Sequence, residues 1–158
     1  MADFSYLSGF SDPPDVDRNI PNRFYPVAWG DVAKAEERIG FRFPPQLRCF
    51  FQQVGSGFFG AAEGCKEVAV ADHVNRILNP IEISDLMMGE SQLAPEEGFD
   101  EGEMPFFEVG DGSFLIMKPV SENPDAVYWS YGPMVSLSLG EFVSELYYRD
   151  PLFYLALG

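Results

Sequence analysis

Few side chains in this sequence could carry nucleophilic or acid–base chemistry. Cys49, Cys65 and His73 are the candidates for a thiol nucleophile and its base. Cys49 lies inside an apolar segment, where a cysteine is more often simply buried, and no carboxylate stands out as a partner for His73. Cys65, beside Lys66 in a glycine-flanked stretch, is a candidate reactive thiol, but chance placement is the simpler explanation. The sequence therefore assigns no catalytic residue.

Residues 55–60 match the G-x-G-x-x-G pattern of dinucleotide-binding loops. That interpretation requires a strand before the glycines and a helix that opens within them. Here a helical pattern comes before the glycines, and Phe58 and Phe59 occupy the variable positions. We interpret the segment as a flexible helix exit whose two phenylalanines help to form an apolar contact patch. No cofactor is expected.

Metal binding is also poorly supported. One histidine and two cysteines sixteen residues apart do not make a zinc site. The acidic residues at 100–103 lack the spacing of a calcium-binding loop, so no metal is expected. Paired carboxylates for hydrolysis stay open, because an acidic chain offers many pairs and no spacing selects one. A small carboxylate-based enzyme is therefore one alternative.

Charge is distributed unevenly along the chain, which has a net charge of −15. Residues 1–76 hold eight basic and ten acidic side chains, whereas residues 77–158 hold two basic and fifteen acidic ones. Between Ile77 and Met117 there are ten carboxylates and no lysine or arginine. Such a field repels nucleic acid and anionic membranes and attracts a basic protein. The alternative is that acidity only keeps the protein soluble.

Residues 90–103 are charged, contain glycine and have no periodicity, which predicts a long loop. An interface needs apolar anchors together with charges that set orientation and rate. The residues that we expect to bind a partner are Phe58, Phe59, Glu96, Glu97, Phe99, Asp100, Glu101 and Glu103. The alternative is a solvated loop with Phe99 tucked into the core.

Two short helices are predicted at residues 31–39 and 45–54. Asp31 can cap the first, and Gly40 and Gly55 end the two helices. Pro45 suits a first helical turn. Apolar residues recur at helical spacing in both segments: Val32, Ala35 and Ile39, then Leu47, Phe50, Phe51 and Val54.

The rest of the chain favours an α+β fold with one mostly antiparallel sheet of about four to six strands and helices packed against it. Strands are predicted at 106–107, 113–117, 126–129 and 134–137, with a weaker one at 67–74 and a strand leading into one helical turn at 81–87. Ser138 and Glu141 have capping-box spacing before a helix at 139–146. Residues 1–28 read as an extended proline-rich and aromatic arm, and 29–158 as a single domain.

The helical pair resembles the SUKH superfamily of fungal cell-wall-synthesis regulators and bacterial toxin-immunity proteins. The resemblance covers about residues 27–148. The matching residues are Glu36, Ile39, Gly40, Phe43, Pro44, Leu47, Phe50, Phe51 and Gly55, then Met104–Phe107 with Gly110–Gly112, and Leu137–Leu139 through Phe142 to Leu146.

That resemblance implies a protein that inhibits a cognate toxin by occluding its working surface, without catalysis of its own. The charge distribution adds that such a toxin is basic, as a nuclease would be. The fungal branch of the superfamily suggests an alternative, a regulatory scaffold for endogenous proteins. No apolar run reaches the ~20 residues of a membrane span and no secretory signal is visible, so we expect a cytoplasmic protein. The sequence does not set its oligomeric state.

Overall fold

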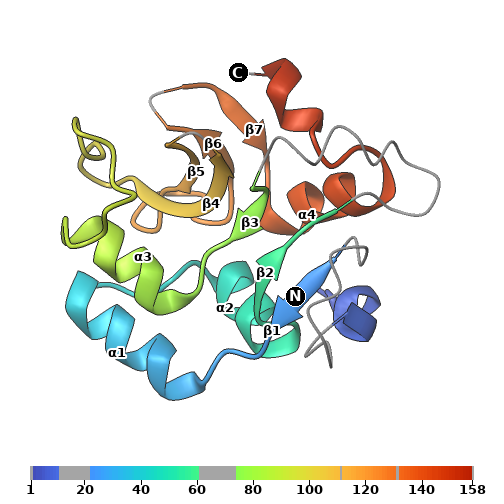
Figure 1. The fold of residues 1–158 in the computed structure, drawn as a ribbon, viewed down its shortest axis with the longest axis horizontal. Helices are drawn as coiled ribbons and strands as arrows, with labels where there is room; N and C mark the ends of the chain where they lie inside the picture. Colours follow the sequence, from blue (N-terminus) through green and yellow to red (C-terminus); the bar gives the residue numbers. More distant parts are fainter. Residues whose placement is uncertain (1, 11–21, 61–73, 111, 131, 158) are drawn as a thin grey trace.

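The computed structural model describes residues 2–10, 22–60, 74–110, 112–130 and 132–157. They form one antiparallel sheet whose strand order follows the order of the chain (Figure 1). The strands are β1 (Arg23–Tyr25), β2 (Ser56–Phe58), β3 (Arg76–Ile77), β4 (Met104–Gly110), β5 (Ser113–Met117), β6 (Val127–Trp129) and β7 (Met134–Ser136). The helices are α1 (Trp29–Ile39), α2 (Pro45–Gln53), α3 (Pro80–Met87) and α4 (Leu139–Tyr148), with 3₁₀ helices η1 (Ser5–Phe10) and η3 (Phe153–Leu157). The α+β class is confirmed.

The described sheet has seven strands rather than four to six. The additional strands come from segments that have no strand pattern in the sequence. β1 lies in the proline-rich arm, and β2 lies in the glycine-rich segment that we had interpreted as a helix exit. Strands of two or three residues are too short to show apolar alternation. They form because main-chain groups pair across the sheet, with Arg23 opposite Phe58 and Gly57 opposite Ile77.

The helical pair is confirmed, with a correction at its start. Helix α1 begins at Trp29, and its N-cap Ala28 makes no side-chain capping bond. Asp31 lies within the first turn instead, where a carboxylate interacts favourably with the helix dipole. Gly40 ends the helix with φ +86°. Helix α2 begins at Pro45, as expected, and buries its predicted face.

Residues 80–87 form helix α3, so the prediction of a strand leading into one turn was wrong. Asn79 accepts a hydrogen bond from the Glu82 amide at 2.8 Å, and the Glu82 carboxylate accepts one from the Asn79 amide at 3.2 Å. Pro80 occupies the first helical position. This reciprocal capping outweighs the strand preference of Ile81 and Ile83.

The C-terminal half follows the sequence prediction closely. Strands β4 to β7 are antiparallel neighbours, and Ser138 accepts a hydrogen bond from the Glu141 amide at 3.1 Å at the start of α4. The apolar stripe of α4 is fully buried. Of the weak strand expected at 67–74, only Val74 lies among the described residues, and its amide donates to the Val109 carbonyl.

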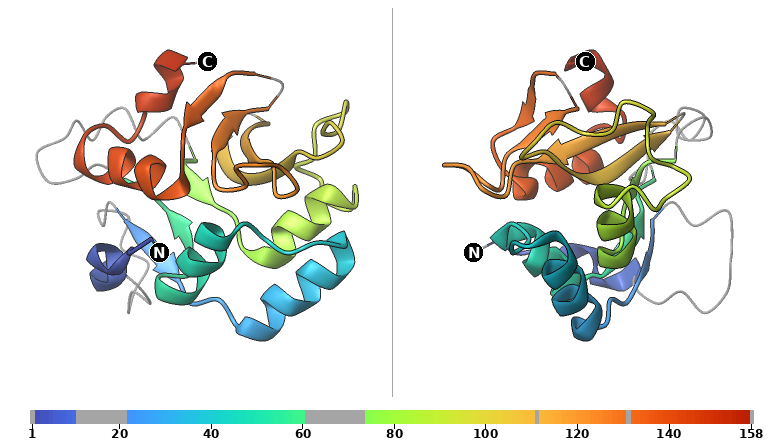
Figure 2. Two further views of the ribbon diagram at one scale, coloured as in Figure 1. Left: turned by 180° about the vertical axis from the view of Figure 1, so that it is seen from behind. Right: turned by 90° about the vertical axis from the view of Figure 1, so that its left-hand side faces the viewer.

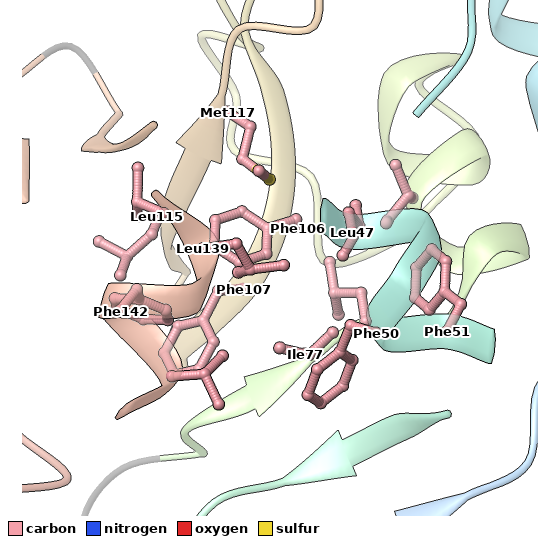
Figure 3. Close-up of a cluster of buried hydrophobic side chains, with 14 of the residues drawn as sticks. Leu47, Phe50, Phe51, Ile77, Phe106, Phe107, Leu115, Met117, Leu139 and Phe142 are labelled. Carbon is pink, nitrogen blue, oxygen red and sulfur yellow. The ribbon is translucent and has the colours of Figure 1, made fainter. Parts of the chain in front are cut away.

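The core contains many aromatic side chains and lies between the sheet and helices α2 and α4 (Figure 3). The β4–β5 register is irregular between Pro105 and Phe107. Phe106 and Phe107 both contact the ring of Phe142, at 5.9 and 5.2 Å between centroids. Figure 2 shows the same ribbon from behind and from one side.

Both ends of the chain contribute to this core. Phe4, just before η1, meets the edge of Phe50 at 5.2 Å between ring centroids. Tyr154 in η3 is buried, and its hydroxyl donates a hydrogen bond to Oδ1 of Asn75. Burial raises the pKa of Tyr154, so the hydroxyl keeps the proton that it donates. The side-chain amide nitrogen of Asn75 in turn donates to the carbonyl of Pro151 at 3.0 Å.

Candidate protein-binding surface

The loop at residues 90–103 connects α3 to β4 and contains neither helix nor strand, as predicted (Figure 1). Phe99 fastens it to the sheet. The Phe99 ring meets the ring of Phe114 edge to face, at 5.8 Å between centroids, and Phe114 in β5 is 3% exposed. This aromatic contact therefore helps to hold the loop on the sheet, and Phe99 itself is half-buried.

Four of the expected carboxylates are exposed on this loop: Glu96, Glu97, Asp100 and Glu101. Glu103 is different, because it is 7% exposed and accepts a hydrogen bond from the Ser130 hydroxyl at 3.4 Å. The acidic surface, as we use the term below, consists of the four exposed carboxylates.

The two phenylalanines expected to accompany this surface lie elsewhere. Phe59 is 1% exposed and packs against Phe24 at 5.0 Å between ring centroids. Phe58 in β2 is half-buried, and the guanidinium groups of Arg23 and Arg76 lie over its ring at 4.9 and 5.8 Å from its centroid. Strands β3 and β4 separate β2 from β5, where the loop is anchored. The structure does not join Phe58 and Phe59 to the acidic loop.

Arg38 of α1 holds the start of the loop, and sequence reasoning missed it. Its guanidinium donates to the Ser84 hydroxyl and to Asp85 Oδ1, both at 2.7 Å, and it also forms an ion pair with Glu90. The hydrogen bond to Asp85, together with the charges of Glu90 and Asp85, raises the pKa of Arg38. One signal was available in the sequence: residues 77–117 contain no cation, so their acids can only pair with cations from another segment.

Replacing Arg38 with glutamine is therefore expected to loosen the loop. The Glu90 amide donates to the Asp85 carbonyl, which makes it a reporter of order at this junction. Hydrogen–deuterium exchange at the amides of residues 90–98 should be faster in Arg38→Gln than in the parent protein. Arg42→Gln, which changes an exposed arginine in the turn between α1 and α2, is the control. Equal exchange in both variants would mean that Arg38 does not order the start of the loop.

A second ion cluster accounts for the buried acid of β4. Glu108 Oε1 accepts hydrogen bonds from Nε and Nη2 of Arg76, at 3.0 and 2.9 Å, while Nη1 of Arg76 donates to Glu82 at 2.6 Å. Burial acts to lower the pKa of Arg76, but the contacts with Glu82 and Glu108 outweigh it and the pKa is raised. Glu108 is thus one half of a structural ion pair.

The remaining candidates for chemistry gain little support. Cys49 is half-buried in α2, against the core. His73 and Cys65 lie outside the described residues. Within the ranges that the structure describes, no three metal-ligating side chains come together. None of the helices described here is long and apolar enough to cross a membrane.

The family model of the SMI1/KNR4 proteins (SUKH-1) matches residues 26–148. The chain belongs to the SMI1/KNR4 family. The matched range includes the helical pair, the acidic loop and helix α4, so it covers every element that positions the acidic surface. The resemblance inferred from the helical pair and the two later segments is confirmed.

Among curated proteins, this SMI1/KNR4 member is similar to the immunity protein YxxD of Bacillus subtilis (strain 168). The two are 26% identical over 148 residues, which cover 90% of this chain and 94% of that protein. The similarity therefore extends over nearly the whole of both molecules. No solved structure gives a significant match.

Proposed function

We propose that this protein is an immunity protein that binds a protein toxin and blocks its working surface. The observation that carries the proposal is the similarity to an immunity protein along almost the full length of both chains. Membership of the SMI1/KNR4 family agrees with it. We further propose that it acts in the cytoplasm, because a toxin that attacks targets inside the cell has to be neutralised there.

The toxin, in this proposal, is basic. The acidic surface places four exposed carboxylates on one anchored loop, in a stretch of 41 residues, from Ile77 to Met117, that holds no lysine or arginine. Complementary charge raises the rate of encounter, from ~10⁵–10⁶ toward ~10⁸–10⁹ M⁻¹s⁻¹ at low salt. A nuclease that works on an anionic substrate needs a positive surface, and covering that surface would stop it.

The proposed action is binding without catalysis. Two carboxylates are buried among the described residues of 77–158. Glu108 is paired with Arg76, and Glu103 accepts a hydrogen bond from the Ser130 hydroxyl. Both groups therefore have structural partners, which favours the binding role over the carboxylate-based enzyme. The regulatory scaffold is separated from immunity by genomic context, because an immunity gene is expected directly beside the gene of its toxin.

The test uses the toxin encoded beside this protein and measures association by surface plasmon resonance at low and high salt. Glu97→Gln combined with Glu101→Gln is expected to slow association at least about tenfold at low salt and to leave the dissociation rate little changed. The matched control is Glu37→Gln with Glu122→Gln, which removes the same charge from exposed positions outside the loop. Equal slowing by both pairs, or an affinity indifferent to salt, would contradict the electrostatic part. Absence of any binding would contradict the immunity role.

A further inference from the structure

A groove of about 990 Å³ lies at the end of the sheet, away from the acidic loop. Residues 134–137 form one wall, along β7, and one side of α4 forms another. Phe153 and Leu157 of η3 close it (Figure 1 shows β7, α4 and the C-terminal helix side by side). Strands β5 and β6 lie between this edge and β4, into which the acidic loop runs.

Strand β7 is the last in the sheet, and no other described strand pairs with its outer edge. Such edges usually carry charges or prolines that discourage pairing with another chain. Here three apolar side chains that line the groove are exposed: Met134 is 43%, Leu137 61% and Leu157 44% accessible. A hollowed apolar edge of this kind marks an interaction site more often than a scattered exposed leucine does.

The groove also carries a negative charge. Glu145 on its wall forms an ion pair with Arg149 at 2.7 Å, so those two charges compensate each other. Glu141, one turn earlier, is exposed and forms no ion pair with any described residue. A second copy of this chain would bring another net charge of −15 to the same place, which opposes self-association. A partner with a positive charge is favoured instead.

We propose that the groove binds an extended segment of a partner protein that carries apolar side chains at alternate positions and a lysine or arginine. An extended segment fits because the groove follows β7, and alternate side chains of such a segment point to one face. Its apolar side chains would cover Met134 and Leu137, and its cation would meet Glu141. In the register between β6 and β7, Val127 lies opposite Ser136 and Tyr128 lies opposite Met134. Val135 is therefore an extra residue in β7, which makes the strand irregular. Main-chain pairing is therefore short, and side chains supply most of the contact.

The experiment selects binders from a phage-displayed library of random eight-residue peptides, using the complete protein. The expected consensus alternates apolar residues and includes lysine or arginine. Leu137→Glu should weaken the selected peptides at least about tenfold, whereas Val120→Glu, the same change at a residue 78% exposed outside the groove, should not. Glu141→Gln should weaken them about threefold to fivefold and reduce the selection of cations, with Glu122→Gln as its control.

Failure takes several recognisable forms. Selection that yields no binder, or binders indifferent to Leu137→Glu, would overturn the proposal, as would peptides that bind as helices. Sedimentation velocity adds a further test: a dimer of the parent protein that Leu137→Glu dissociates would make a second copy the occupant. The test uses no toxin, so it is independent of the immunity proposal. Slower association of the acidic-loop variant with the toxin bears on the immunity proposal alone.

Discussion

Replacing Phe107 with alanine is expected to lower the free energy of unfolding by about 3–5 kcal/mol. Phe107 is fully buried in the centre of the sheet. Its ring lies within 5.2–6.4 Å, centroid to centroid, of rings from β4, α4, the C-terminal helix and the residue after β2: Phe59, Phe106, Phe142 and Tyr154. Alanine would leave a cavity bordered by separate elements that cannot close on it together.

Urea denaturation followed by circular dichroism measures this loss. Phe107→Leu, which removes less volume, should cost clearly less than the alanine variant. Met88→Ala, at a residue 52% exposed just after α3, should change stability by no more than about 0.5 kcal/mol. If Phe107→Ala lost less than about 1 kcal/mol, the aromatic rings around it would not form a tightly packed core.

Local patterns that repeat over a whole helix proved predictable. The α2 face of Leu47, Phe50 and Phe51 was readable because three residues at helical spacing report the same buried side. Helix α3 was not readable in this way, because Ile81 and Ile83 match a strand equally well. The Asn79–Glu82 capping pair that decides between the two was present in the sequence, and weighing it would have given the right answer.

The charge of the candidate surface was predictable from the sequence, but the contacts that hold its loop in place were not. Exposed carboxylates such as Glu97 follow from composition, since ionised side chains stay in water unless they are paired. Two residues hold the loop from other elements. Arg38 lies 52 residues away in sequence from its partner Glu90, and Phe114 belongs to β5. Only the fold brings them to the loop.

Phe58 and Phe59 illustrate the same limit. Neighbouring residues in a strand point to opposite faces, so two adjacent phenylalanines cannot share one surface if the segment is extended. No strand pattern in the sequence predicted β2, because its strand character comes from pairing with β1 and β3. Once β2 is present, Phe59 joins the core and Phe58 lies beneath two arginines.

The glycine-rich segment at residues 55–60 serves close packing of β1 on β2, and Gly55→Ala should show this by a large loss of stability. Gly55 has φ +117°, and a Cβ there would lie 2.0 Å from the Tyr25 carbonyl oxygen. Gly57 is equally confined, with a Cβ 2.1 Å from the Arg23 carbonyl oxygen. Because both clashes are with backbone, β1 would have to move. The expected loss for Gly55→Ala is about 3 kcal/mol or more, at the upper end of point mutations.

Gly40→Ala is the matched control, because it separates conformational strain from the clash. Gly40 also has a positive φ, +86°, but nothing lies within 4 Å of a Cβ there. Strain alone should cost about 1–2 kcal/mol. Chemical denaturation of both variants gives the difference. Equal losses would mean that β1 does not approach β2 this closely.

A dinucleotide site at residues 55–60 would instead predict that NAD stabilises the parent protein against heating, whereas close strand packing predicts no shift of Tm with NAD.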